Sequence, residues 1–220
     1  MTVKPRSTPR AARDRLIYWT MWVVLALPLP ITLFYGLTGP VRLREDMIRD
    51  LGLWGVRILI LGLCITPAAR LLRRPALLRY RRTVGLFGFA YAAVHGPYYF
   101  VYGRLWELPL ELWARRLYFV IGIVSLLLLT PLAITSTDGM IRRLGPLRWR
   151  RLHQSTYAAM VLVGVHALWQ ASIDHTQPAI YMALIAALLI VRLPPVMRAL
   201  TGRRRGRAVS RPGVASAPAD

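Results

Sequence analysis

Long apolar segments alternate with short polar stretches along most of the chain. Each segment is close to the roughly 20 residues that an α-helix needs to cross the hydrocarbon core of a bilayer. Their continuous apolar runs lack the alternation of a barrel strand, and only helices or closed barrels satisfy the backbone inside a membrane. We therefore expect an all-α, polytopic membrane bundle of six transmembrane helices. The six segments are 17–36, 51–71, 84–102, 116–135, 154–171 and 178–197.

The basic residues between the segments predict the orientation. If the polar stretches are assigned to alternate sides, the side of the N-terminus carries 23 of the 30 Lys and Arg residues and the other side carries 7. The positive-inside rule places the richer side, with both termini, in the cytoplasm. The predicted organisation is a basic cytoplasmic arm (1–16), a transmembrane domain (17–198) and a basic disordered cytoplasmic tail (199–220).

Composition agrees with this segregation of apolar and basic residues. The chain is 55% hydrophobic and yet has a formal net charge of +21. A nucleic-acid-binding protein would gather such charge on one soluble face, whereas the arginines here stand at segment ends, so no nucleic-acid partner is expected. The single cysteine, Cys64, offers no disulfide or CxxC pair. The sequence shows no internal repeat and no catalytic motif.

Two histidines lie inside apolar segments, where an ionisable side chain is a functional candidate because its lost hydration must be offset. His95 and His166 stand twelve and fourteen residues from the cytoplasmic starts of their segments. At helical rise these positions are about 18 and 21 Å deep, in the outer half of the membrane. Parallel helices with imidazoles at one depth suit the two axial positions of a heme iron. The alternative is a pair of histidines hydrogen-bonded to neighbouring helices.

His153 lies at the cytoplasmic boundary, in the stretch RWRRLH. It is either a solvated histidine or a ligand of a second heme nearer the cytoplasm. The symmetric position, thirteen residues before His95, is Arg82, which is not a usual iron ligand. Thirteen residues also leave two side chains about 140° apart on an ideal helix, so His153 and His166 need not face one groove. His175, in a short outer loop, is expected to be solvated.

A set of motifs in this region resembles a known family. Residues 80–102 read YRRTVGLFGFAYAAVHGPYYFVY, and PLAITST is followed by the pattern RLG..W..LH..TY around His153. Together with the spaced histidines, this set is similar to the MsrQ family, also called YedZ. That family belongs to the ferric reductase-like transmembrane group, which is related to the membrane part of NADPH oxidases. The resemblance covers about residues 50–200.

The resemblance implies an electron-transfer subunit rather than a catalytic one, in the bacterial inner membrane. Electrons would come from the quinone pool or from a cytosolic flavin reductase and pass through heme b, with FMN as a further cofactor. They would leave to MsrP, a periplasmic molybdenum-cofactor enzyme that repairs oxidised methionines. The family's histidines carry over to His95, His153 and His166. The NADPH oxidase relatives have a second histidine on the helix that corresponds to 84–102, which this chain lacks.

Arginines near these sites are candidates for holding the acidic groups of cofactors. We place Arg57, Arg115 and Arg116 near the outer level, where one would pair with a heme propionate or simply reach lipid headgroups. On the cytoplasmic side a basic collar would hold an FMN phosphate, an acidic donor protein or anionic lipid. The collar consists of Arg79, Arg81, Arg82, Arg142, Arg143, Arg148, Arg150 and Arg151.

Other classes of protein remain as alternatives. A small-solute transporter would need polar residues along several spans, which are scarce here. A membrane scaffold would leave the histidines without a role. A cytochrome b561-like quinol or ferric reductase is the nearest redox alternative, although such proteins normally carry more paired histidines.

Overall fold

The computed structural model of the chain is helical over the residues it describes, which are 9–102, 109, 117–170 and 175–202. Over these residues it contains no β-strand, which confirms the all-α class. The helices are α1 (Pro9–Ala26), α2 (Pro28–Thr38), α3 (Val41–Leu71), the 3₁₀ turn η1 (Pro75–Arg79), α4 (Tyr80–Tyr102), α6 (Leu117–Ile134), α7 (Asp138–His153), α8 (Ser155–Gln170), α9 (Thr176–Arg192) and α10 (Pro194–Gly202).

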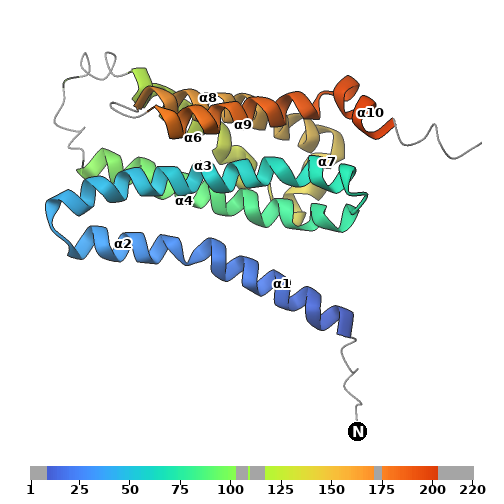
Figure 1. The fold of residues 1–220 in the computed structure, drawn as a ribbon, viewed down its shortest axis with the longest axis horizontal. Coiled ribbons are helices and arrows are strands. Elements are labelled where there is room, and N and C mark those ends of the chain that lie inside the picture. Colours follow the sequence, from blue (N-terminus) through green and yellow to red (C-terminus); the bar gives the residue numbers. More distant parts are fainter. Residues whose placement is uncertain (1–8, 103–108, 110–116, 171–174, 203–220) are drawn as a thin grey trace, which may run out of the picture.

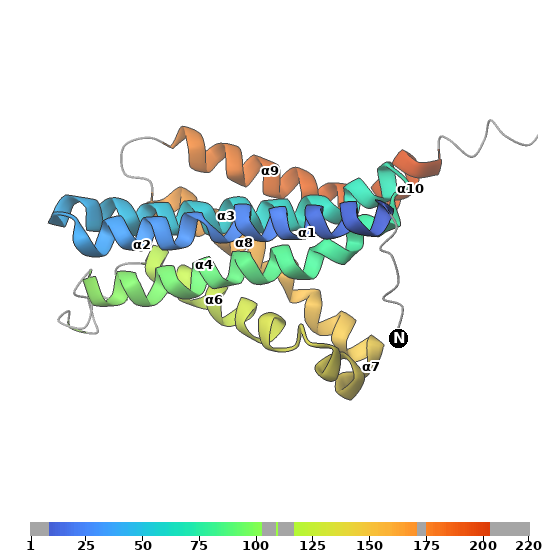
Figure 2. The same cartoon turned by 90° about the horizontal axis from the view of Figure 1, so that it is seen from below.

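The long helices lie side by side in an elongated bundle (Figures 1 and 2). Helix α3 packs along α4, α6 packs along α8, and α9 lies against both α3 and α8. One buried apolar cluster joins α3 to α6, α8 and α9, and a second joins it to α4 and the α1–α2 pair. Helix α3 is therefore the shared wall between the two halves of the core, which explains why it is almost completely buried at Leu51 and Leu63.

Three helical stretches have the length and apolarity to cross a membrane, namely Ala12–Thr38, Asp46–Leu71 and Leu117–Ile134. The pair α9–α10 makes a fourth if its 74° bend falls within one crossing. Helix α4 has 23 residues but carries tyrosines, glycines, a histidine and a proline, and α8 has only 16 residues. The described residues are therefore consistent with a membrane helix bundle that has three or four candidate crossings, while the number of six crossings stays a prediction.

Prolines set the breaks in the first and last segments. The segment predicted at 17–36 consists of α1 and α2, which meet at Leu27 just before Pro28. The segment predicted as one helix at 178–197 is wrong in its second part. Helix α9 ends at Arg192, and Pro194 begins α10 in a new direction, because proline removes a backbone donor and disfavours a helical residue before it.

Helix α7 was not foreseen as an element, because the stretch 136–152 reads as a polar connection. The structure shows a helix from Asp138 to His153, kinked at Gly145, whose φ of 74° places it in the left-handed region that glycine tolerates. Thr137 caps its first turn by accepting a hydrogen bond from the backbone N–H of Met140 at 3.2 Å. The many arginines of α7 obscured this signal.

The connections alternate between the two ends of the bundle. The start of α1, the turn between α3 and α4, helix α7 and helix α10 lie at one end in both views (Figures 1 and 2). The turn between α2 and α3 and the start of α9 lie at the other. Helix α1 begins within the predicted arm 1–16, and α10 extends into the predicted tail 199–220 as far as Gly202. The rest of that arm and tail lies outside the described residues.

Candidate functional site

The structure brings His95 of α4 and His166 of α8 together. Their ring centroids are 6.3 Å apart and their planes are inclined by 73°. The two residues are 71 positions apart in the sequence, so only the packing of the two helical hairpins α3–α4 and α6–α8 makes them neighbours. Both rings are partly buried between helices. This pair is the centre of the candidate site.

Each imidazole is held by a backbone carbonyl of the neighbouring helix. Nδ1 of His95 lies 2.8 Å from the carbonyl oxygen of Ile48 on α3, and Nδ1 of His166 lies 2.7 Å from that of Tyr118 on α6. A carbonyl oxygen only accepts, so Nδ1 carries the proton in both rings. Nε2 of each neutral ring therefore keeps its lone pair, which is the state of a histidine that ligates a metal.

A glycine on each neighbouring helix makes room for the ring. A Cβ atom added to Gly52 of α3 would lie 3.1 Å from Cε1 of His95, and one added to Gly122 of α6 would lie 2.8 Å from Cε1 of His166. Each glycine follows the carbonyl residue by four positions, on the same helix face. Both hairpins thus repeat one arrangement of carbonyl, glycine and imidazole, although the sequence shows no internal repeat.

The pair fits the requirements of a heme iron. A nitrogen ligand lies about 2 Å from a metal ion. When two imidazoles bind one ion, the two metal–nitrogen distances and the two distances from nitrogen to ring centre add up to a separation of roughly 6 Å between the ring centres. Within the described part of the chain no group of three or more His, Cys, Asp or Glu residues is placed to hold a metal ion. Two imidazoles alone are an incomplete ligand set, whereas a porphyrin supplies the remaining four nitrogens.

Arg57 lies in the middle of α3 rather than near the outer level as expected. It stands eleven residues after Asp46 and fourteen before Leu71, because α3 is one continuous helix that already begins at Val41. Its Nε donates to the hydroxyl of Tyr181 on α9 at 2.8 Å, and its guanidinium lies 5.2 Å from the ring centre of Trp54. Arg115 and Arg116 lie outside the described residues.

His153 is the last residue of α7 and lies apart from the histidine pair. Its Nδ1 donates to the carbonyl of Trp149 at 3.1 Å, and its ring stacks on Trp149 with centroids 3.8 Å apart. Burial lowers the pKa of His153, and the bond to the Trp149 carbonyl acts in the opposite direction. Ser136, 3.5 Å from Nε2, already donates its hydroxyl to the Leu132 carbonyl at 2.6 Å. Nε2 therefore keeps its lone pair available.

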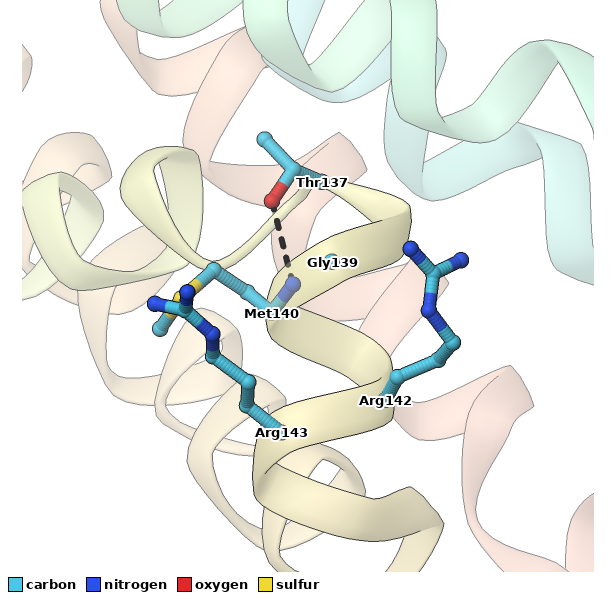
Figure 3. A pocket seen from close by; sticks show the side chains of 5 residues that line it. All are labelled: Thr137, Gly139, Met140, Arg142 and Arg143. Carbon is cyan, nitrogen blue, oxygen red and sulfur yellow. Dashed lines mark hydrogen bonds between the residues drawn. The ribbon is translucent and has the colours of Figure 1, made fainter.

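The basic collar has two different environments. Arg82 and Arg79 are engaged with acids, at 2.7 Å to Asp138 and 3.1 Å to Asp14. Arg142 and Arg143 border a hollow of about 530 Å³ at the start of α7. Figure 3 shows their side chains leaving opposite sides of the helix, so the two guanidinium groups flank the hollow without converging on one point.

Comparison with known proteins adds the family. Residues 51–164 match the family described as ferric reductase like transmembrane component. The chain is 38% identical to a protein-methionine-sulfoxide reductase heme-binding subunit MsrQ of Caulobacter vibrioides, with 86% of this chain and 91% of that protein covered. The chain belongs to the MsrQ family. The MsrQ proteins of Rhodospirillum rubrum (39% identical, 90% and 96% covered) and Brucella ovis (38%, 94% and 96%) are similar to the same extent.

The alignment with MsrQ proteins covers the whole candidate site. The ferric reductase-like match begins at Leu51, includes His95 and His153, and ends two residues before His166. The matches to the MsrQ relatives are longer, at 196 to 217 residues. The recognition of the family from its motifs is thereby confirmed. The relatives are named heme-binding subunits of a methionine sulfoxide reductase.

Proposed function

We propose that the chain binds heme b between the hairpins α3–α4 and α6–α8, with His95 and His166 as axial ligands. The observation that carries the proposal is the imidazole pair at 6.3 Å, with both Nδ1 atoms held by backbone carbonyls. The carbonyls of Ile48 and Tyr118 fix each ring in the tautomer that presents Nε2. Because both rings are held before the cofactor arrives, little side-chain freedom is lost on binding.

The heme, when bound, supplies a one-electron redox centre. Ligation by both His95 and His166 would leave the iron no open position, which would favour electron transfer over oxygen chemistry. Both rings are partly buried between helices, and this limited access of water would influence the potential of a bound heme. The described residues supply no acid–base constellation beside the pair, and electron transfer requires none.

The position of the pair supports a role in electron transfer across the inner membrane. Ile48 lies near the start of α3 and Tyr118 near the start of α6, and both starts are at the end of the bundle opposite α7 and α10. Under the positive-inside rule that end is periplasmic. Electrons taken from the quinone pool, or from a cytosolic flavin reductase, would leave from there to a periplasmic methionine sulfoxide reductase of the MsrP type.

A second cofactor site at the cytoplasmic end is part of the same proposal. His153 has an available Nε2, and the positive charge of Arg81 acts on its ring; Arg82 of the same collar is paired with Asp138 at 2.7 Å. These residues are candidates to hold FMN, whose phosphate the arginines would bind. Arg57, held by Tyr181 at 2.8 Å, is the candidate partner of a heme propionate in the apolar region.

An absorption spectrum of the purified protein, oxidised and then reduced with dithionite, tests the proposal. We expect a b-type spectrum that is lost in His95→Ala and in His166→Ala. His175→Ala is the matched control, since this histidine precedes α9 at the periplasmic end and should leave the spectrum unchanged. A His153→Ala variant should retain the signal of the outer heme. A well-folded wild-type protein without heme would overturn the proposal, and failure of reduced protein to donate electrons to MsrP would remove the partner.

A further inference from the structure

A basic pocket lies at the cytoplasmic end of the bundle, opposite the end that holds the histidine pair. It has a volume of about 720 Å³ and is formed where the end of α3, the junction of α7 and α8, and the bend between α9 and α10 meet. Four arginines line it and no acid does. The lining residues are Arg70, Arg150, Gln154, Arg192, Pro194, Met197, Arg198 and Thr201.

The positive charge of this pocket has no counter-charge among the described residues. The two ion pairs among the described residues involve Arg79 and Arg82, and neither arginine lines the pocket. Arg192 donates from Nη2 to the Leu63 carbonyl at 2.7 Å, while its Nε is buried without a hydrogen-bond partner in the described part of the chain. Because four guanidinium groups line the pocket without an acidic partner in that part of the chain, the pocket is suited to an anion.

The position of α10 brings the pocket to the membrane surface. Helix α10 turns 74° away from α9 and is anchored by Met197, which is 4% exposed. Arg198 lines the pocket from α10, while Leu193 and Leu200 are exposed apolar side chains of the same region. A short helix with an anchored apolar side and a basic side is typical of a segment lying in the headgroup region.

We propose that this pocket binds the phosphate of an anionic phospholipid from the cytoplasmic leaflet. Basic pockets between transmembrane helices on this side of a membrane recognise such headgroups. The guanidinium groups supply charge-assisted hydrogen bonds to the phosphate, and Thr201 and Gln154 add polar contacts at the rim. The exposed Leu193 and Leu200 give the acyl chains an apolar surface, which a soluble phosphate would not use. This site does not depend on heme binding.

Native mass spectrometry of the detergent-purified protein tests the proposal with phosphatidylglycerol as the probe and phosphatidylcholine as the neutral comparison. We expect wild type to retain phosphatidylglycerol in preference. In Arg70→Gln/Arg198→Gln the affinity should fall by at least about tenfold, since each arginine near a membrane surface contributes roughly a fivefold effect. The matched control is Arg13→Gln/Arg15→Gln, which removes the same charge from exposed positions at the start of α1, at the same end of the bundle, and should bind like wild type.

Three results would overturn the proposal. The first is equal retention of phosphatidylglycerol by wild type and by the pocket variant. The second is equally tight binding of glycerol 3-phosphate, the headgroup without acyl chains, because the ligand would then be a soluble phosphate compound. The third is a failure of wild type to distinguish phosphatidylglycerol from phosphatidylcholine, which contradicts the proposal without any variant. If the double variant folds poorly, retention of phosphatidylglycerol is compared between wild type and the single variants Arg70→Gln and Arg198→Gln, whose side chains are exposed.

Discussion

At the scale of single residues, each candidate ligand depends on groups that are not side chains. His95 and His166 bond to the carbonyls of Ile48 and Tyr118, and each ring occupies space that a glycine leaves free. The orientation of both rings is therefore determined by backbone on a neighbouring helix. A substitution that adds a single methyl group to that backbone is consequently as informative as removal of a histidine.

Gly122→Ala is expected to lower heme content by about tenfold or more, within the range found for changes to groups that support metal ligands. The added Cβ would lie 2.8 Å from Cε1 and 2.9 Å from Nδ1 of His166, so the ring must shift away from the Tyr118 carbonyl. Heme per protein, from the absorbance of the purified protein, measures the effect. Gly85→Ala on α4 is the control, because a Cβ there meets nothing within 4 Å and heme content should not change. Equal heme content in both variants would contradict this account.

The sequence predicts the histidines but not their supports. An ionisable side chain within an apolar segment is conspicuous, and helical rise is regular enough to show that His95 and His166 share a depth. A carbonyl has no residue-specific signal, and Gly52 and Gly122 resemble any small residue at a helix contact. Which glycine faces which ring depends on how the hairpins pack. Arg57 was misplaced for a similar reason, since a single arginine in an apolar run does not reveal where its helix begins.

At the scale of elements, a proline in α3 frees a carbonyl that another helix then binds. Pro67 within α3 has no N–H, so the Leu63 carbonyl four residues earlier lacks its helical donor. Arg192 at the end of α9 donates to this carbonyl at 2.7 Å. A proline in one helix thus creates the acceptor that fixes the end of another. The proline is visible in the sequence, but the arginine that donates to the freed carbonyl lies 125 positions after the proline.

A double-mutant cycle tests this link between α3 and α9. Arg192→Gln should destabilise the protein by about 1–3 kcal/mol, the effect of leaving a buried acceptor unpaired. In a Pro67→Ala background the loss should be smaller by about 1 kcal/mol, because the alanine N–H can bond to the Leu63 carbonyl. Chemical unfolding in detergent measures the four proteins. Additive effects of the two substitutions would show that the bond between Arg192 and Leu63 does not depend on the proline.

The contact between Arg57 and Tyr181 gives a second test of packing between α3 and α9. Tyr181→Phe removes the hydroxyl that accepts from Arg57 and leaves a guanidinium in an apolar region with one fewer partner. We expect a loss of about 1–3 kcal/mol, seen as a Tm lower by several degrees. Tyr18→Phe, on the 38%-exposed Tyr18 of α1, should leave Tm unchanged. If both variants melt like wild type, the Arg57 contact contributes no stability.

Elements that follow from apolar length are the ones the sequence predicts well. The fourth segment, expected at 116–135, corresponds to α6 at Leu117–Ile134. Helix α7 was missed because its arginines outweigh its apolar positions, and the break between α9 and α10 was missed because hydropathy averages over Pro194. Both are elements of the membrane surface, where the contrast between apolar and polar residues is weakest. The capping Thr137 and the pair Pro194–Pro195 were the local signals available in the sequence.

At the scale of the whole molecule, the direction of the proposed electron transfer depends on how the bundle sits in the membrane. Helices α8 and α9 have 16 and 17 residues, about 24 and 26 Å by helical rise, which is short for a hydrocarbon core of about 30 Å. Both can cross only if residues beyond their ends complete the span or if the bilayer thins locally. An even number of crossings is required for both termini to be cytoplasmic.

Labelling of single cysteines from one side of the membrane decides the topology. In a Cys64→Ser background, His175→Cys and Thr201→Cys place a thiol at the two ends of the α9–α10 pair. With an impermeant maleimide on intact spheroplasts, we expect labelling of His175→Cys and, for Thr201→Cys, labelling only after permeabilisation. This result would put the histidine pair at the periplasmic end and the basic pocket in the cytoplasmic leaflet. Labelling of both positions from outside would mean that α9 does not cross, and the predicted route of electrons through the molecule would then lack its outward direction.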